Sequence, residues 1–298
     1  MDSYPIIAVT EEMIRHDEPM GSKEKFWCEI PVESGFGGHW LFKHPRDELG
    51  KAEHVSEKIA CEIARLLKVE CADVELAEFQ EWRGTVARDF RKQDEVLVHG
   101  NEIIAGRVTD YDPERKHRTS DHTWQRIRQA ISSVCGDRCE EDLGQLASYL
   151  LLDALIGNTD RHHENWGLLR QGVGQTANHR LAPSFDHASS LGREMRDDRR
   201  VRLLCENKIE GYVRSGRGAI YLEELGETAV SALTLVEKLM PAMSGHFRAR
   251  LSNLSEVTDK RIERILFAVP GDWMTQPQRD FASAMLRVSR DLLFKIVT

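Results

Sequence analysis

Two carboxylates and one carboxamide stand close together in the sequence. Asp160 and Asn165 lie in the polar run 157–167, and Asp186 follows a short apolar run. A phosphoryl-transfer site needs one group that orients the attacking hydroxyl and oxygen ligands that hold Mg²⁺ on the nucleotide phosphates. Asp, Asn and Asp supply these groups, since a loop can turn back between Asp160 and Asn165. The pattern therefore indicates phosphoryl-transfer chemistry.

The same stretch admits two other readings. Taken one at a time, Asp160 can cap a turn, Asn165 can take a left-handed backbone position, and Asp186 can begin a loop. His163 and His187 lie close to the carboxylates in the sequence, so a transition-metal site of a metal-dependent phosphohydrolase is a further alternative. That alternative leaves the N-terminal part of the chain without a role.

The N-terminal ninety residues are predicted to form strands around one helix. Residues 25–31 and 38–43 are β-prone runs joined by a glycine-bearing turn, which indicates a hairpin. Apolar residues recur at helical spacing over 52–67, and residues 74–79 and 85–90 return to a strand-like pattern. We expect a small antiparallel β-sheet with one helix.

The remainder of the chain is predicted to be mainly helical. Residues 142–156 carry a broad apolar face that indicates a buried helix. Further helices are predicted at 222–240, 259–267 and 279–296, and short strands at 166–169 and 181–186. The expected fold class is α+β, with a nucleotide-binding lobe at 1–90 and a helical catalytic lobe at 91–298.

The catalytic segments resemble those of the HipA-like kinases, which read N-x-D-x-H-x-x-N-(F/W) and then (T/A)-P-x-(F/Y)-D. Residues 158–166 read N-T-D-R-H-H-E-N-W, and residues 182–186 read A-P-S-F-D. The resemblance implies a bilobal protein-kinase-like fold. It also implies that Asp160 is the catalytic base and that Asn165 and Asp186 are the metal ligands. The D-R-H-x-x-N core is similar to that of phosphatidylinositol kinases as well.

Such a fold needs a strand lysine for the nucleotide phosphates and a helical glutamate that holds the lysine. Lys43 ends the run 38–43, and Glu57 lies in the predicted helix. The family pattern selects Glu57, whereas spacing alone does not choose between Glu57 and Glu53. Helical periodicity places Glu57 nearly opposite the apolar stripe, so its side chain faces either solvent or, on a face turned from the sheet core, the cleft between the lobes.

Two further segments are candidates for nucleotide contacts. Gly35, Gly37 and Gly38 could bring backbone N–H groups to the phosphates, or could simply turn a hairpin. The chain is expected to cross between the lobes near Arg88 and Phe90, where the backbone would meet the adenine.

The resemblance implies an ATP- and Mg²⁺-dependent kinase that transfers the γ-phosphoryl group to Ser or Thr hydroxyls of a protein or of itself. A protein substrate and an antitoxin-type partner, as in toxin–antitoxin pairs, are implied with it. Ser184, Ser189 and Ser190 are candidate autophosphorylation sites, or else exposed loop serines. A phosphoinositide-type lipid kinase and a catalytically inactive nucleotide-binding module remain alternatives. Larger family members carry an additional N-terminal domain, whereas this sequence begins almost directly at the predicted small lobe.

Composition narrows the classes of protein. The 298 residues are 41% hydrophobic and 30% charged, which suits a folded core and excludes global disorder. With 41 basic and 49 acidic residues, the net charge of -8 argues against direct binding of nucleic acid. The sequence contains no apolar run long enough to span a membrane and no signal-peptide pattern, so we expect a cytoplasmic protein with no membrane partner.

Overall fold

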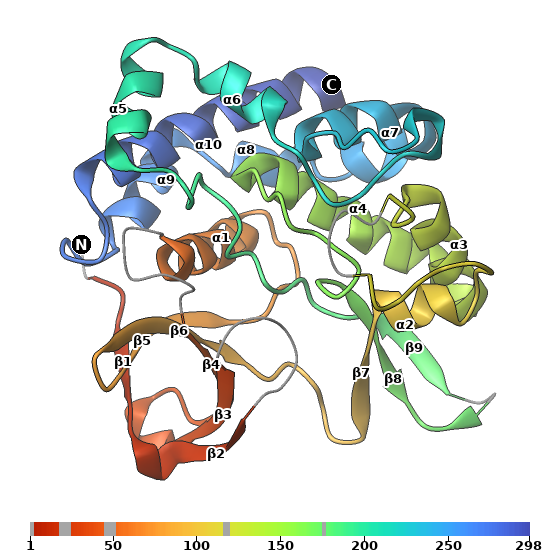
Figure 1. Ribbon diagram of the computed structural model, residues 1–298, viewed down its shortest axis with the longest axis horizontal. Helices are drawn as coiled ribbons and strands as arrows, with labels where there is room; N and C mark the ends of the chain where they lie inside the picture. The colour runs from red at the N-terminus through yellow and green to blue at the C-terminus, as the bar shows by residue number, and fades with distance from the viewer. Residues whose placement is uncertain (1–2, 18–24, 45–51, 116–119, 175–176) are drawn as a thin grey trace.

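The computed structural model describes residues 3–17, 25–44, 52–115, 120–174 and 177–298. It has a curled β-sheet lobe packed against a larger helical lobe (Figure 1). The predicted α+β class is therefore confirmed. The predicted division into 1–90 and 91–298 stays a prediction.

The sheet of the small lobe has six strands in the order β1-β5-β6-β4-β3-β2. The strands are β1 (Ile6–Val9), β2 (Ile14–Asp17), β3 (Lys25–Ile30), β4 (Gly38–Lys43), β5 (Val74–Phe79) and β6 (Trp82–Arg88). The predicted hairpin is β3 with β4. The sheet is antiparallel except at one edge, where β1 pairs in parallel with β5. Strands β1 and β2, and with them this parallel pair, were not predicted from the sequence.

The helical lobe contains a three-stranded sheet and most of the helices. The strands are β7 (Glu95–His99), β8 (Gly167–Gln171) and β9 (Asn178–Leu181), in that order. The helices are α2 (Gly100–Ala105), α3 (Trp124–Val134), α4 (Cys139–Ile156), α5 (Asp197–Cys205), α6 (Ile209–Ser215), α7 (Ala232–Arg248), α8 (Leu251–Ser255), α9 (Asp259–Phe267) and α10 (Gln276–Val297). The buried helix α4 packs against α7 and α10. It ends at Gly157, whose left-handed backbone (φ 61°) starts the polar loop.

One more helix, α1 (Glu53–Leu66), lies between the sheet and the helical lobe (Figure 1). It contacts β5 and β6 and also α4 and α9. Its buried side chains Val55, Ile59 and Ile63 belong to the large core cluster of the helical lobe, whereas Phe42 belongs to a separate cluster in the sheet. Packing on more than one side leaves little of α1 in contact with water.

Several predicted elements differ in their ends, two of them clearly. The helix predicted at 222–240 begins only at Ala232, because Ser231 caps it by accepting the N–H of Thr234, and it continues through Pro241. The strand predicted at 181–186 ends at Leu181. Among the helices in the described part of the chain, none combines the length and hydropathy that a membrane-spanning segment requires.

Candidate active site

Lys43, the last residue of β4, lies in a cluster of opposite charges. Its Nζ donates to Glu57 Oε1 at 2.6 Å and lies 3.7 Å from Asp186 Oδ1. Glu57 Oε2 also accepts the Thr85 hydroxyl from β6 at 3.1 Å. Burial alone lowers the pKa of the Lys43 ammonium, but the Asp186 and Glu57 carboxylates outweigh burial and raise the pKa. The structure therefore brings a charged lysine together with two predicted site residues, one of them from the helical lobe.

Of the two orientations considered for Glu57, the solvent-facing one is wrong, because the residue is only 2% exposed. Periodicity assumes that a helix turns one face to water, and α1 is covered by the sheet as well as by the helical lobe. Glu53, which spacing alone left open, pairs with Arg193 instead. The geometry thus selects the glutamate that the family pattern favoured.

The loop after α4 folds back on itself around Asp160. The Asp160 N–H donates to Asn158 Oδ1 at 3.0 Å, and Asn165 Nδ2 donates to the Asp160 carbonyl oxygen at 2.7 Å. One carboxylate oxygen of Asp160 accepts the Ser189 hydroxyl at 3.2 Å. The loop therefore turns back between Asp160 and Asn165, as the spacing predicted.

Arg161, which the sequence analysis did not single out, joins three parts of the site. Its guanidinium makes a two-point contact with Asp153 on α4, at 2.8 and 2.7 Å. It also donates to the Asn165 carbonyl oxygen at 2.8 Å and to Ser184 Oγ at 2.9 Å. Burial alone lowers the pKa of Arg161, and Asp153 more than reverses this effect. Asp153 could have indicated this contact from the sequence, since a carboxylate in a largely apolar helix needs a cationic partner.

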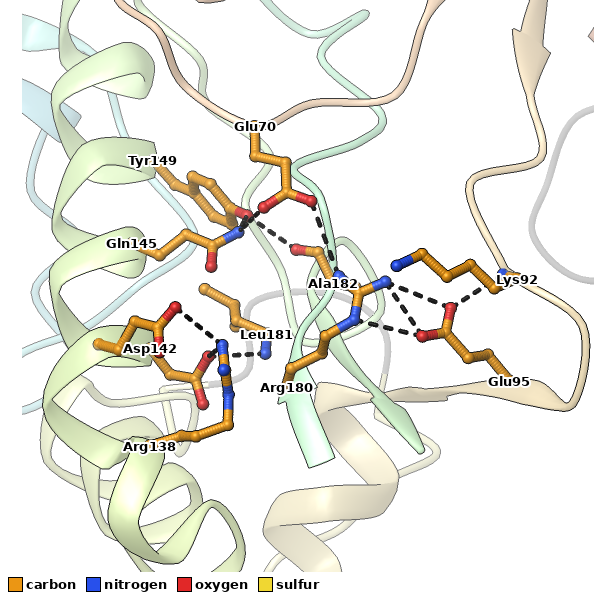
Figure 2. A network of polar contacts seen from close by, with 11 residues as sticks. Glu70, Lys92, Glu95, Arg138, Asp142, Gln145, Tyr149, Arg180, Leu181 and Ala182 are labelled. Atoms are coloured by element: carbon orange, nitrogen blue, oxygen red, sulfur yellow. Dashed lines mark hydrogen bonds and ion pairs between the residues drawn. The ribbon is translucent and has the colours of Figure 1, made fainter. Parts of the chain in front are cut away.

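The segment that precedes Asp186 is fixed to α4 by polar contacts, which Figure 2 shows. The Leu181 N–H donates to Asp142 Oδ1 at 2.9 Å, and the Tyr149 hydroxyl donates to the Ala182 carbonyl oxygen at 2.8 Å. The Asp142 and Tyr149 side chains both come from α4. The start of the A-P-S-F-D segment is therefore held on the same helix that carries the Arg161 partner.

Asp186 itself has a left-handed backbone, with φ of 56°. The neighbouring His187 accepts from or donates to Ser184 Oγ at 2.7 Å. Burial, with help from the Arg161 charge, lowers the pKa of His187 to about 3. The imidazole is therefore neutral at physiological pH.

The histidines do not form the metal site of the phosphohydrolase alternative. The His163 Nδ1 lies 2.6 Å from the Tyr111 hydroxyl, and His187 contacts Ser184. Within the described ranges, no three His, Cys, Asp or Glu side chains are grouped to hold a metal ion. These contacts count against a phosphohydrolase built on His163 and His187.

The serines near Asp186 are not exposed loop residues. Ser184, Ser189 and Ser190 are all buried, and each hydroxyl makes a hydrogen bond within the protein. The alternative of three solvent-exposed serines is therefore wrong. Whether any of them accepts a phosphoryl group stays a prediction.

The glycine-bearing turn between β3 and β4 spans residues 31–37 and contains a short 3-10 helix, Val32–Ser34. Gly35 has φ of 80°, and a Cβ at Gly37 would lie 2.6 Å from Val32 Cα. Arg88 Nη2 donates to the Gly37 carbonyl oxygen at 2.7 Å, and a Cβ at Gly38 would lie 3.7 Å from the same nitrogen. Arg88 therefore holds the turn, and contact of these glycines with phosphate stays a prediction.

The predicted crossing between the lobes begins where β6 ends. The N–H groups of Arg88 and Asp89 donate to the carbonyl oxygens of Asp73 and His39, so the small lobe uses both donors. The Phe90 ring stacks on Phe185 with centroids 5.8 Å apart, next to Asp186. Contact of this segment with adenine stays a prediction.

A cavity of about 860 Å³ opens beside Asp160. Thr159 and His162 of the loop line it, together with Arg115 and Arg217. Lys43, Glu57, Asn165 and Asp186 do not line it. Of the predicted site residues, Asp160 is thus the one that lines this space in the described part of the chain.

Residues 19–246 match the family model described as the HipA-like C-terminal domain. The chain belongs to this family. The predicted family is thereby confirmed, and the catalytic segments of this HipA-like protein fall within the matched residues.

Solved structures show the fold. The Helicobacter pylori proinflammatory kinase CtkA superposes with a TM-score of 0.81 at 16% identity, over 98% of this chain and 96% of that chain. A chain of the Shewanella oneidensis MR-1 toxin–antitoxin complex of HipA, HipB and operator DNA gives a TM-score of 0.61 at 10% identity, over 95% of this chain and 66% of that chain. The HipA-like protein thus has the fold of a kinase. A search of curated proteins finds no match.

Proposed function

We propose that this HipA-like protein is an ATP- and Mg²⁺-dependent kinase that phosphorylates Ser or Thr hydroxyls of a protein or of itself. The observation that carries the proposal is the buried contact of Lys43 with Glu57 and Asp186. A lysine of this kind is a point charge suited to nucleotide phosphates, and the glutamate holds it in place. The kinase fold and the family membership support the same conclusion.

The donor set fits Mg²⁺ that arrives with the nucleotide. Mg²⁺ is usually held by one or two protein oxygen ligands and completes its shell with phosphates and water. Asn165 and Asp186 would provide two such ligands. When bound, the ion would neutralise charge on the phosphates.

The remaining residues position the reactants. Asp160 accepts the Ser189 hydroxyl and lines the 860 Å³ cavity, so its carboxylate can orient an acceptor hydroxyl that enters from there. The acceptor oxygen bonds to the γ-phosphorus, the bond from that phosphorus to the bridging oxygen breaks, and ADP leaves. Asp160 accepts the hydroxyl proton. Positioning and charge neutralisation supply most of the acceleration.

The cavity beside Asp160 favours a protein acceptor over a lipid. Its lining includes Arg115, Arg217 and Glu227, which are polar partners for a polypeptide. A lipid kinase would need a cationic or apolar surface toward a membrane, whereas the chain carries a net charge of -8. Because all three metal-site and base residues are present, an inactive nucleotide-binding module is the weaker alternative.

The test is transfer from labelled ATP in the presence of Mg²⁺, followed by mass mapping of the phosphorylated residue. Asp160→Ala and Asp186→Ala should each abolish transfer and retain the fold, whereas the exposed control Asp198→Ala should transfer normally. Retained activity in both site variants would refute the assignment. Transfer to phosphoinositide vesicles alone would favour the lipid kinase, and tight ATP binding without turnover would favour the inactive module.

We also propose an antitoxin-type protein partner. The Shewanella oneidensis HipA is found with HipB and operator DNA, which supports this partner class. The net charge of -8 makes direct contact with DNA the less favourable arrangement for this chain. Co-purification of a tagged chain from its own cells would test the partner, and recovery of the chain alone at high yield would count against it.

A further inference from the structure

A second cavity, of about 660 Å³, lies at the C-terminal end of α1, where α1 meets α9 and the N-terminal segment. Figure 1 shows these three parts of the chain close together, and the Tyr4 N–H donates to the Ala268 carbonyl oxygen at 2.7 Å. The residues of the active site do not line this cavity. This cavity is therefore separate from the active site, although α1, the helix that carries Glu57, contributes to both.

Four basic side chains line the cavity: Arg65, Lys68, Arg261 and Arg264. The two carboxylates in its lining are ion-paired, and the cations that pair with Glu62 are also shared with Glu75 and Asp73. Glu62 pairs with Lys58 at 2.7 Å and with Arg65 at 2.5 Å, and Glu256 pairs with Arg261.

Lys68 and Arg264 are the other two basic side chains of the lining. Both are exposed, and within the described part of the chain neither has a carboxylate partner. They face one cavity on a protein whose net charge is -8. Such a local excess of positive charge attracts an anion. Arginine and lysine side chains together are the usual partners of a phosphoryl group.

The cavity is too large for a phosphate ion alone, and part of its wall is apolar. Tyr4, Leu66, Ile265 and Ala268 contribute this part of the lining. A phosphoryl group attached to a polypeptide would place its charge on the basic side chains and its neighbouring side chains on the apolar wall. A phosphorylated segment therefore fits the cavity better than a free anion.

We propose that this cavity binds a phosphorylated polypeptide segment and that binding favours the position of α1 in which Glu57 reaches Lys43. A segment held by Lys68, just beyond α1, and by Arg264 on α9 would bridge two elements that already pack together and would reinforce that contact. Binding that stabilises this position must also tighten nucleotide binding, because coupling between two sites is reciprocal. The regulatory half of the proposal rests on the proposed kinase function, whereas the binding half does not.

Binding is measured by fluorescence anisotropy with a labelled short peptide that carries one phosphoserine between leucines. Lys68→Ala and Arg264→Ala should each weaken binding about fivefold, since each removes one charge-assisted contact at an exposed site. Lys260→Ala removes an exposed cation of α9 outside the cavity and should bind as the parent does. Circular dichroism checks that every variant is folded.

Equal binding of the phosphorylated and unphosphorylated peptides would overturn the proposal, as would parent-like binding by both cavity variants. Inorganic phosphate that competes as tightly per molecule as the peptide would overturn the polypeptide part and leave a site for free anions.

Coupling is measured as ATP affinity with and without saturating phosphopeptide. The parent should bind ATP more tightly with the peptide, and the Lys68→Ala and Arg264→Ala variants should show a smaller gain. Peptide binding with no change in ATP affinity would overturn the regulatory half. A chain that binds the phosphopeptide but no ATP would instead refute the proposed kinase function, so the two failures are distinguishable.

Discussion

Replacement of Arg161 by Met tests how the two catalytic segments are held together. The side chain is 3% exposed and donates to Asp153, to the Asn165 carbonyl oxygen and to Ser184 Oγ. Met fills similar space but donates nothing. The variant therefore leaves a buried carboxylate without its cation and two further acceptors without their donor.

Loss of one partner of a buried ion pair costs about 3–5 kcal/mol, because the remaining charge stays in a poorly solvating interior. Asp153 keeps one hydrogen bond, from Asn158 Nδ2 at 2.8 Å, so we expect the lower part of this range. The free energy of unfolding is measured by urea titration followed by circular dichroism. The exposed pair Arg214 with Glu210, at 2.9 Å, is the control, and Arg214→Met should cost about 0.5 kcal/mol or less.

A second substitution separates stability from catalysis. Asp153→Leu in the Arg161→Met background removes the unpaired carboxylate and should recover most of the lost stability. Phosphoryl transfer should stay low, because Asn165 and Ser184 still lack their common donor. The reasoning is refuted if Arg161→Met costs less than about 1 kcal/mol, or if the double variant regains both stability and full transfer.

Three other predictions concern single residues. Glu57→Gln removes the charge that holds the site lysine, so ATP affinity should fall about tenfold in a titration, and unchanged affinity would contradict the role of the pair. Burial lowers the pKa of His122 and of His187 to about 3, from the ordinary 6.5, so the unfolded chain binds more protons between these values. Stability should therefore fall as the pH drops from 6.5 toward 3, by up to about 1.4 kcal/mol per pH unit for each ring. Urea titrations of His187→Gln should show a shallower slope, and an unaltered slope would argue against a neutral buried ring. Gly37→Ala places a Cβ against the backbone of its own turn and should destabilise the protein by about 1–3 kcal/mol. The control Gly211→Ala, with open space around the added atom, should change unfolding by less than about 1 kcal/mol, and similar effects of the two would discount the steric argument.

Local signals predicted those elements whose ends are set by nearby residues. The bounds of α9 agree with the predicted 259–267, since Thr258 caps the helix by accepting the Arg261 N–H. The start of α7 was placed too early, because the apolar pattern continues upstream of the Ser231 cap. Strand β1 was missed because the strand with which it pairs, β5, lies far along the chain, and a pairing of that kind leaves no local pattern.

The site residues divide in the same way. Asp160 and Asp186 were predicted from the spacing of the motifs, and Lys43 from the need of a kinase-like fold for a strand lysine. Periodicity did not predict that Glu57 is buried, because its burial depends on the packing of α1 against both the sheet and the helical lobe. Arg161 was quoted within the motif but given no role, because its partners Asp153 and Ser184 come together only in the folded chain.

The position of α1 has a consequence for dissecting the protein. Its apolar side chains Val55, Ile59 and Ile63 share one core with α4 and the other helices, although the chain around them forms the sheet. Cutting the chain near residue 90 would expose the apolar face of α1 on the N-terminal piece. It would also expose the apolar surface that this face covers on the C-terminal piece. The two pieces should therefore be made together, as a nicked pair that reassembles, rather than as independent units.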